Sequence, residues 1–160
     1  SLGVANQQIA PLMALEMANR GRSALVFRGD DGLDELTTTA KSQIWQVSGG
    51  EVLSFDFDPQ VIGLPRAQAS QLVGGDPHFN AQVAKAVLAG DVVGNLKAVR
   101  DIVLLNAAGG LVAYELAKDP KNASLDFTER MHEALARVTQ ALDDGRAVEK
   151  LSDWTAATAL

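Results

Sequence analysis

The sequence predicts an α/β fold: a mostly parallel sheet flanked by helices, with a β-hairpin and a helical C-terminal region. The apolar run SALVF at residues 23–27 has the length of a strand and no polar alternation, which is typical of a strand covered on both faces. At residues 43–57, β-branched and aromatic residues alternate with polar ones around Gly49 and Gly50, which indicates a hairpin. Beyond Pro59 the apolar spacing becomes helical, so helices should dominate the rest of the chain.

Apolar spacing and helix-end residues predict where the helices lie. An amphipathic helix over residues 7–20 precedes the strand at 23–27, and a helix followed by a buried strand favours a parallel sheet. Asp76 and Asp126 are N-cap residues for two of the later helices. The later helices are expected at residues 77–90, 100–117, 127–142 and 148–157. The 100–117 segment is apolar almost all round, so it should be the innermost helix.

Composition limits the class of protein. The 160 residues suffice for one domain with a real core, and no linker divides them. The 14 basic and 20 acidic residues give a net charge of −6 without a basic cluster, which argues against a nucleic-acid partner. No apolar stretch reaches the roughly 20 residues that a membrane span needs. The lack of cysteine excludes disulfides and thiolate metal sites and fits a cytoplasmic location.

The segment GDDGLDEL, residues 29–36, follows the predicted strand directly and carries four carboxylates. In a bend after Gly32, the neighbouring side chains of Asp34 and Glu35 can turn toward one point, whereas on a strand they would face opposite ways. Mg²⁺ is held in this manner by one or two carboxylates together with a substrate phosphate. Spacing alone also fits an exposed acidic turn whose carboxylates cap a following helix.

Four motifs in order resemble the anthranilate phosphoribosyltransferase family. GDDGLDEL is similar to the family's HG-x-DGLDE segment, and QLVGGDPHFNAQVAKAVLAG resembles its L-x-GGD-x-x-x-NA stretch. RDIVLLNAAGGLVA is similar to its RD-x-VLLNAA helix, and ALDDGRAVEKLSDWTAAT resembles its closing segment. The resemblance covers essentially the whole chain.

The resemblance implies an activity and a metal site. The family transfers a phosphoribosyl group from phosphoribosyl pyrophosphate to the amino group of anthranilate, a step of tryptophan biosynthesis. Asp34 and Glu35 match the Asp-Glu pair that coordinates Mg²⁺ in the family, and Gly32 matches the glycine that shapes the bend. Asn106 belongs to a buried helix behind the site, so we expect its side chain to be hydrogen-bonded inside the core.

The resemblance also implies that residues 1–160 are the C-terminal α/β portion of a longer enzyme. The family's glycine-rich phosphate-binding loop, its anthranilate-binding arginine and its metal-sharing serine have no match here and precede the matched motifs, as does its N-terminal helical domain. We therefore assign no catalytic residue, expect the substrate-binding residues in the N-terminal part, and expect the isolated chain to be inactive. The family generally forms homodimers.

Two other functions fit parts of the sequence. A pyrimidine nucleoside phosphorylase would have a related fold, but the acidic pair is not expected there. A non-catalytic fragment that serves as a packing module would explain the missing phosphate loop. His78 and His132 have no nucleophile beside them in sequence, so we expect surface or capping roles. Gly109 and Gly110, inside the apolar helix, should allow close packing.

Overall fold

The computed structural model describes residues 1–159, which fold around a four-stranded sheet in the order β1-β2-β3-β4. The strands are β1 Leu2–Gly3, β2 Ala24–Gly29, β3 Ser42–Ser48 and β4 Glu51–Phe57. Only β1 and β2 run parallel within these residues, while β2 with β3 and β3 with β4 are antiparallel. The α/β class is confirmed, but the sheet is mixed rather than mostly parallel, because the hairpin supplies two of its four strands.

The hairpin turn lies where the sequence predicts it. Gly49 and Gly50 form a two-residue loop with φ angles of 61° and 82°, and Ser48 pairs with Glu51 across it. Positive φ at both central positions belongs to the turn type whose twist matches that of the flanking strands, and glycine adopts it without steric cost. The alternation around the two glycines therefore sets both the turn and the register.

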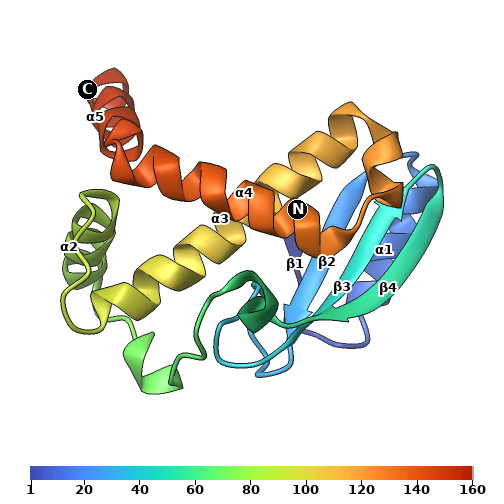
Figure 1. The fold of residues 1–160 in the computed structure, drawn as a ribbon, viewed down its shortest axis with the longest axis horizontal. Helices are drawn as coiled ribbons and strands as arrows, with labels where there is room; N and C mark the ends of the chain where they lie inside the picture. Colours follow the sequence, from blue (N-terminus) through green and yellow to red (C-terminus); the bar gives the residue numbers. More distant parts are fainter. Residues whose placement is uncertain (160) are drawn as a thin grey trace.

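Helices make up most of the remaining chain (Figure 1). The α-helices are α1 Ala10–Asn19, α2 Pro77–Leu88, α3 Leu96–Lys118, α4 Phe127–Asp143 and α5 Arg146–Thr158. Residues 1–159 also contain three short 3-10 helices: η1 Pro59–Ile62 and η2 Ala69–Gln71 lie between β4 and α2, and η3 Pro120–Ser124 lies between α3 and α4. Both predicted caps are confirmed, since the Asp76 carboxylate accepts from the Phe79 N–H and that of Asp126 from the Glu129 N–H. None of the helices in residues 1–159 combines the length and the apolarity that crossing a membrane requires.

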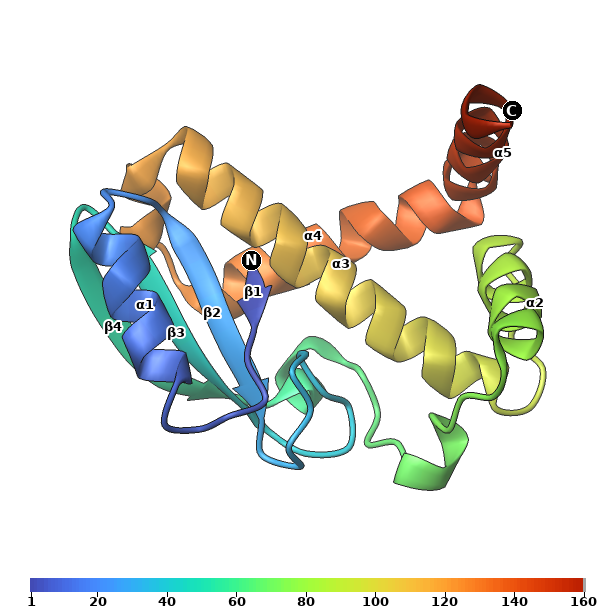
Figure 2. The same ribbon diagram turned by 180° about the vertical axis from the view of Figure 1, so that it is seen from behind.

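The central strand β2 is covered on both faces, as its unbroken apolar run predicts. On one face Val26 packs with Ala10 and Ala14 of α1. On the other face Leu25 and Phe27 belong to a larger core that α3 and α4 complete. Figures 1 and 2, seen from opposite sides, place α1 on one side of the sheet and α3 and α4 on the other.

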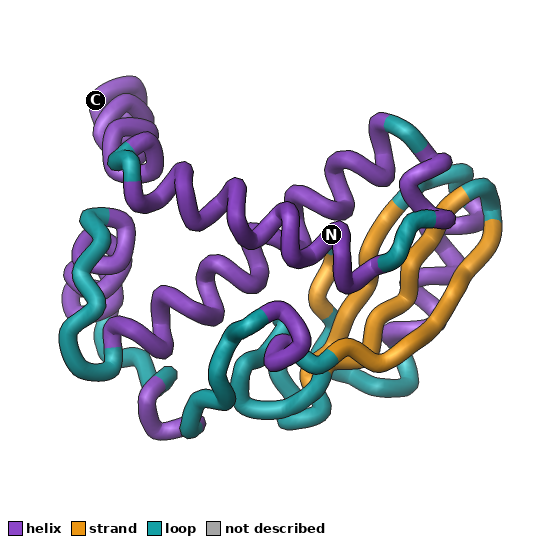
Figure 3. The backbone as a smooth tube through the Cα atoms, in the orientation of Figure 1, coloured by secondary structure: helices purple, strands orange, loops and turns teal. Residues whose placement is uncertain are grey.

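The two ends of the molecule differ in character. Figure 3 shows the strands gathered at one end, while α2 and α5 lie at the other, beyond the sheet. A small cluster of Val87, Leu104 and Leu142 joins α2, α3 and α4 there. Helix α3 joins this cluster through Leu104 and the core against the sheet through Leu105, so it connects both ends.

Candidate functional site

The acidic turn, defined as residues 29–35, begins at the carboxyl end of β2. Gly32 has φ of 97°, a backbone conformation that residues with a Cβ rarely adopt, and it marks the sharp bend. The turn is closed by two backbone hydrogen bonds, from the Gly29 N–H to the Leu33 carbonyl at 2.9 Å and from the Gly32 N–H to the Gly29 carbonyl at 3.0 Å. The bend predicted after the strand is therefore present and internally bonded.

The Asp31 carboxylate stabilises the turn through hydrogen bonds. One of its carboxylate oxygens accepts from the Thr37 hydroxyl at 2.6 Å and from the Thr39 hydroxyl, and the other accepts from the Leu33 N–H at 3.1 Å. Burial by itself would raise the pKa of Asp31, but these hydrogen bonds outweigh it, and the pKa is lowered. Asp31 is thus an ionised structural residue.

Asp34 and Glu35 behave differently from Asp31. Both are exposed, and within residues 1–159 neither carboxylate takes part in a hydrogen bond or ion pair. Burial raises the pKa of Glu35, and the negative charge of Asp34 raises it further. The second effect reflects the closeness of the two carboxylates, and a cation placed beside them would offset the repulsion.

The pKa of Glu35 provides a direct test of this electrostatic picture. We expect NMR titration to place it above the ordinary glutamate value of about 4.3, and we expect Asp34→Asn to lower it. Because the folded state then binds the proton more tightly than the unfolded state, this carboxyl destabilises the metal-free chain at neutral pH. That destabilisation disappears as the pH falls through the raised pKa. A titration midpoint at or below the ordinary value would contradict the raised pKa, and an unchanged midpoint in Asp34→Asn would contradict the proximity of the two groups.

Helix α3 holds the residue that follows the pair. The Asn106 side chain accepts from the Leu36 N–H at 2.9 Å and donates to the Leu36 carbonyl at 2.8 Å. Leu36 is fully buried, and its Cδ1 would lie 2.7 Å from a Cβ built on Gly109. Asn106 is hydrogen-bonded as expected, but it is partly buried rather than enclosed in the core. The expectation of close packing is confirmed for Gly109 and wrong for Gly110, where an added Cβ would meet nothing within 4 Å.

The first strand also contacts the pair. A Cβ added to Gly3 would lie 1.5 Å from the carbonyl oxygen of Asp34, so the backbone of β1 passes directly against the turn. Only glycine permits this approach. The backbone around the pair is therefore contacted by β1 at Asp34 and by α3 at Leu36.

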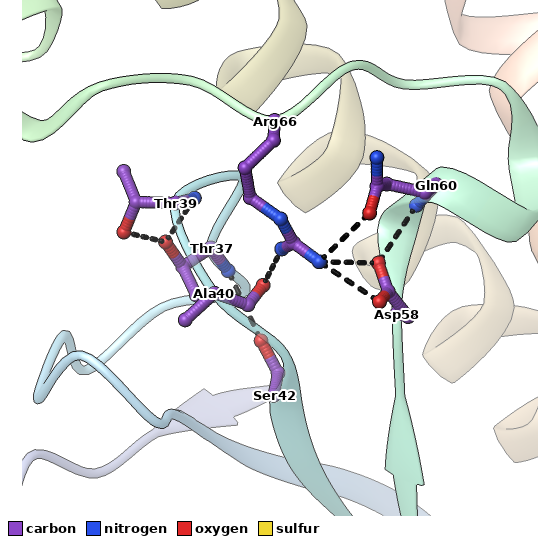
Figure 4. Close-up of polar contacts among 7 residues, drawn as sticks. All are labelled: Thr37, Thr39, Ala40, Ser42, Asp58, Gln60 and Arg66. Carbon is purple, nitrogen blue, oxygen red and sulfur yellow. Dashed lines mark hydrogen bonds and ion pairs between the residues drawn. The ribbon is translucent and has the colours of Figure 1, made fainter.

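Arg66 anchors the segment that leaves the turn (Figure 4). Its guanidinium donates to both oxygens of the Asp58 carboxylate, at 2.7 and 2.8 Å, and to the carbonyl of Ala40. The Thr37 N–H, on the same segment, donates to the Ser42 hydroxyl at 3.1 Å. These contacts tie residues 37–41 to the end of β4 and the start of η1.

The Arg66 contacts predict a measurable loss of stability. We expect Arg66→Ala to lower the free energy of unfolding by about 1–3 kcal/mol, the range for partly buried hydrogen bonds to charged groups. Arg20→Ala is the matched control, because the Arg20–Glu16 pair is largely exposed, with side chains 66% and 47% accessible, and such pairs contribute roughly 0–1 kcal/mol. Urea unfolding followed by circular dichroism measures both; equal losses would contradict the anchoring role.

Sequence reasoning missed several residues that shape the turn. Arg28 donates to the Ala5 carbonyl at 2.8 Å and to the Gly29 carbonyl at 2.9 Å, so a cation stands beside the acidic turn. Thr37, Thr39 and Arg66 were missed as well. The run of three threonines that begins two residues after the pair is the signal that could have found the first two, since hydroxyls near a bend commonly bond its carboxylates.

Other titratable and charged side chains lie away from the acidic turn. His78 contacts Gln82 on the surface of α2, and Arg100 pairs with Asp143 at 2.6 Å, so neither joins the acidic turn. Cavities of about 710 and 590 Å³ lie beside α2 and beside β4, and neither is lined by the acidic turn. Within residues 1–159, no three His, Cys, Asp or Glu side chains come together as a metal site. The acidic pair by itself supplies at most two protein ligands.

Comparison with known sequences gives a consistent picture. The glycosyl transferase family, a/b domain, matches residues 1–148. The chain is 49% identical over 158 residues to the anthranilate phosphoribosyltransferase of Leifsonia xyli subsp. xyli, a match that covers 99% of this chain and 44% of that protein. The enzyme of the same name from Nocardioides sp. is 46% identical over 160 residues, with the same coverage of 99% and 44%. The chain therefore spans less than half the length of these curated relatives.

Solved structures share the fold. The anthranilate phosphoribosyltransferase of Thermus thermophilus superimposes with a TM-score of 0.74 at 29% identity, over 96% of this chain and 41% of that one. The enzyme from Saccharomyces cerevisiae, solved in complex with PRPP and Mg, gives a TM-score of 0.76 at 23% identity, over 94% and 40%. The fold of the described residues thus recurs as part of larger chains.

Proposed function

This chain belongs to the glycosyl transferase family, a/b domain, and from that premise we propose that it forms the C-terminal α/β part of an anthranilate phosphoribosyltransferase. The whole enzyme would transfer a phosphoribosyl group from phosphoribosyl pyrophosphate (PRPP) to the amino group of anthranilate, in tryptophan biosynthesis, and release pyrophosphate. The observation that carries the proposal is the exposed Asp34–Glu35 pair in the bend after β2, in a chain 49% identical to a relative with that name.

The pair fits a hard divalent cation. Its donors are carboxylate oxygens on adjacent residues, and no hydrogen bond among residues 1–159 occupies them. Mg²⁺ completes its coordination with water and substrate phosphate oxygens, so two protein ligands suffice. The Saccharomyces cerevisiae relative binds PRPP together with Mg. We propose that Asp34 and Glu35 hold Mg²⁺ with the diphosphate of PRPP, where the ion would neutralise negative charge on the leaving group.

The remaining parts of the enzyme are proposed to lie outside this chain. The relatives are more than twice as long, and we assign the phosphate-binding loop and the anthranilate site to their unmatched part. The whole enzyme is proposed to be a cytoplasmic homodimer. The 160-residue chain contributes half of the metal and donor site, so we expect no turnover from it alone.

A chimera tests the proposed function. The segment of the Leifsonia xyli relative that matches this chain over 158 residues would be replaced by this chain. We expect the chimera to form phosphoribosyl anthranilate from PRPP and anthranilate in a Mg²⁺-dependent manner, and to restore growth of a tryptophan auxotroph that lacks the enzyme. The parent relative is the positive control. A folded chimera without this activity would contradict the assignment.

A further inference from the structure

We propose that Asn106 is a positioning residue for the Asp34–Glu35 pair, and that helix α3 sets the place of the metal ligands through Leu36. This inference rests on the proposed function, because it concerns the same metal site. Asn106 is not one of the proposed metal ligands and would act on them through Leu36.

Hydrogen bonds within residues 1–159 do not fix the side chains of the two proposed ligands. Within residues 1–159, the carboxylates of Asp34 and Glu35 have no hydrogen-bond partner, so only their backbone can determine where they stand. A metal ligand must be held to within about 0.5 Å of its productive position to bind well. Whatever fixes the backbone at residues 34–36 therefore controls cation affinity.

Asn106 forms hydrogen bonds with both backbone polar groups of Leu36. Its Oδ1 accepts from the Leu36 N–H at 2.9 Å, and its Nδ2 donates to the Leu36 carbonyl at 2.8 Å and to the Ile102 carbonyl at 3.0 Å. The amide therefore pairs with Leu36 as a neighbouring strand would, and it is itself fixed to its own helix. Partial burial protects these bonds from competition by water.

A packing contact with Gly109 also fixes Leu36. The fully buried Leu36 side chain lies against Gly109, one turn further along α3, where a Cβ would come within 2.7 Å of Cδ1. Asn106 and Gly109 thus hold Leu36, directly after Glu35. Gly3 contacts the backbone of Asp34.

Mn²⁺, a paramagnetic substitute for Mg²⁺, measures this role without turnover. In NMR spectra of the 160-residue chain, Mn²⁺ should broaden the resonances of Asp34 and Glu35 first. We expect Asn106→Ala to raise the Mn²⁺ concentration that gives half-maximal broadening by at least about threefold, since the ligands lose their pre-organised geometry. Val112→Ala is the matched control: Val112 is a buried residue of the same helix, and its truncation destabilises the core without touching the turn.

A second pair of variants tests the inference by a different contact. Gly109→Ala presses on Leu36, whereas Gly110→Ala meets nothing within 4 Å. We expect weaker Mn²⁺ binding from the first and unchanged binding from the second. Unchanged affinity in both Asn106→Ala and Gly109→Ala, or an equal loss in Val112→Ala, would overturn the positioning role. Mn²⁺ that fails to broaden Asp34 and Glu35 in the unsubstituted chain would contradict the metal pair and this inference together, whereas the chimera assay tests the transferase assignment separately.

Discussion

Removing both charges of the acidic pair, by Asp34→Asn together with Glu35→Gln in the chimera, is expected to lower Mg²⁺-dependent turnover about 100-fold or more. Both substitutions keep the size of the side chain but give up the anionic oxygens that a hard cation requires. A bound ion contributes several kcal/mol by neutralising charge on a leaving diphosphate, and two to three powers of ten in rate correspond to that loss. The measurement is kcat/KM for PRPP as a function of Mg²⁺ concentration.

Asp30→Asn is the control for this experiment. Asp30 lies in the same acidic turn and is exposed, but its only hydrogen bond among residues 1–159 runs from its backbone N–H to the Lys41 carbonyl. Its substitution removes one negative charge from the turn without removing a proposed ligand. We expect nearly unchanged kinetics. If the double variant kept the Mg²⁺ dependence of the parent, or if Asp30→Asn lost as much activity, the pair would not be the metal site.

Shortening a buried side chain on the innermost helix, α3, is expected to give the largest loss of stability. Leu105 on α3 is fully buried in the core between α3, α4 and the sheet. Leu105→Ala should lower the free energy of unfolding by about 2–5 kcal/mol, because it removes the transfer free energy of the side chain and leaves a cavity in a close-packed interior. Urea unfolding of the 160-residue chain, followed by circular dichroism, measures the change.

Val103→Ala separates this effect from helix propensity. Val103 lies two residues away on the same helix but is 41% exposed. Alanine is the better helix former, so the loss of partial burial and the gain in propensity oppose each other, and we expect a change of less than about 1 kcal/mol. A similar loss in both variants would mean that α3 does not pack on the sheet as described.

Local signals account for most of the elements. The two glycines at positions 49 and 50 predict the hairpin because their positive φ suits a two-residue turn, and Asp76 and Asp126 predict helix starts because their carboxylates can reach the first free N–H groups. Strand direction is different, because it depends on which distant strand pairs with β2. That pairing made the sheet mixed where the sequence suggested a mostly parallel one.

The same difference between local signals and long-range contacts applies to the candidate site. The residues proposed to carry its chemistry, Asp34 and Glu35, could be named from the sequence, because a bend after a strand and adjacent carboxylates are local features. The sequence could also indicate that Asn106 is a hydrogen-bonded polar residue on the inner helix. Its partner Leu36 lies 70 positions away, however, and no local pattern joins them.

The sequence by itself determined β2, the β3–β4 hairpin, the approximate places of the α-helices and the acidic pair, because each depends on the conformational preferences and spacing of neighbouring residues. The two-residue strand β1 was not predicted, because it is a strand only through its pairing with β2. Only the tertiary structure decided the strand directions, the separate structural role of Asp31, and the hold of Asn106, Gly109 and Gly3 on the backbone around the pair. These depend on contacts between segments far apart in the chain, which form only when helix and sheet pack together to remove apolar surface from water.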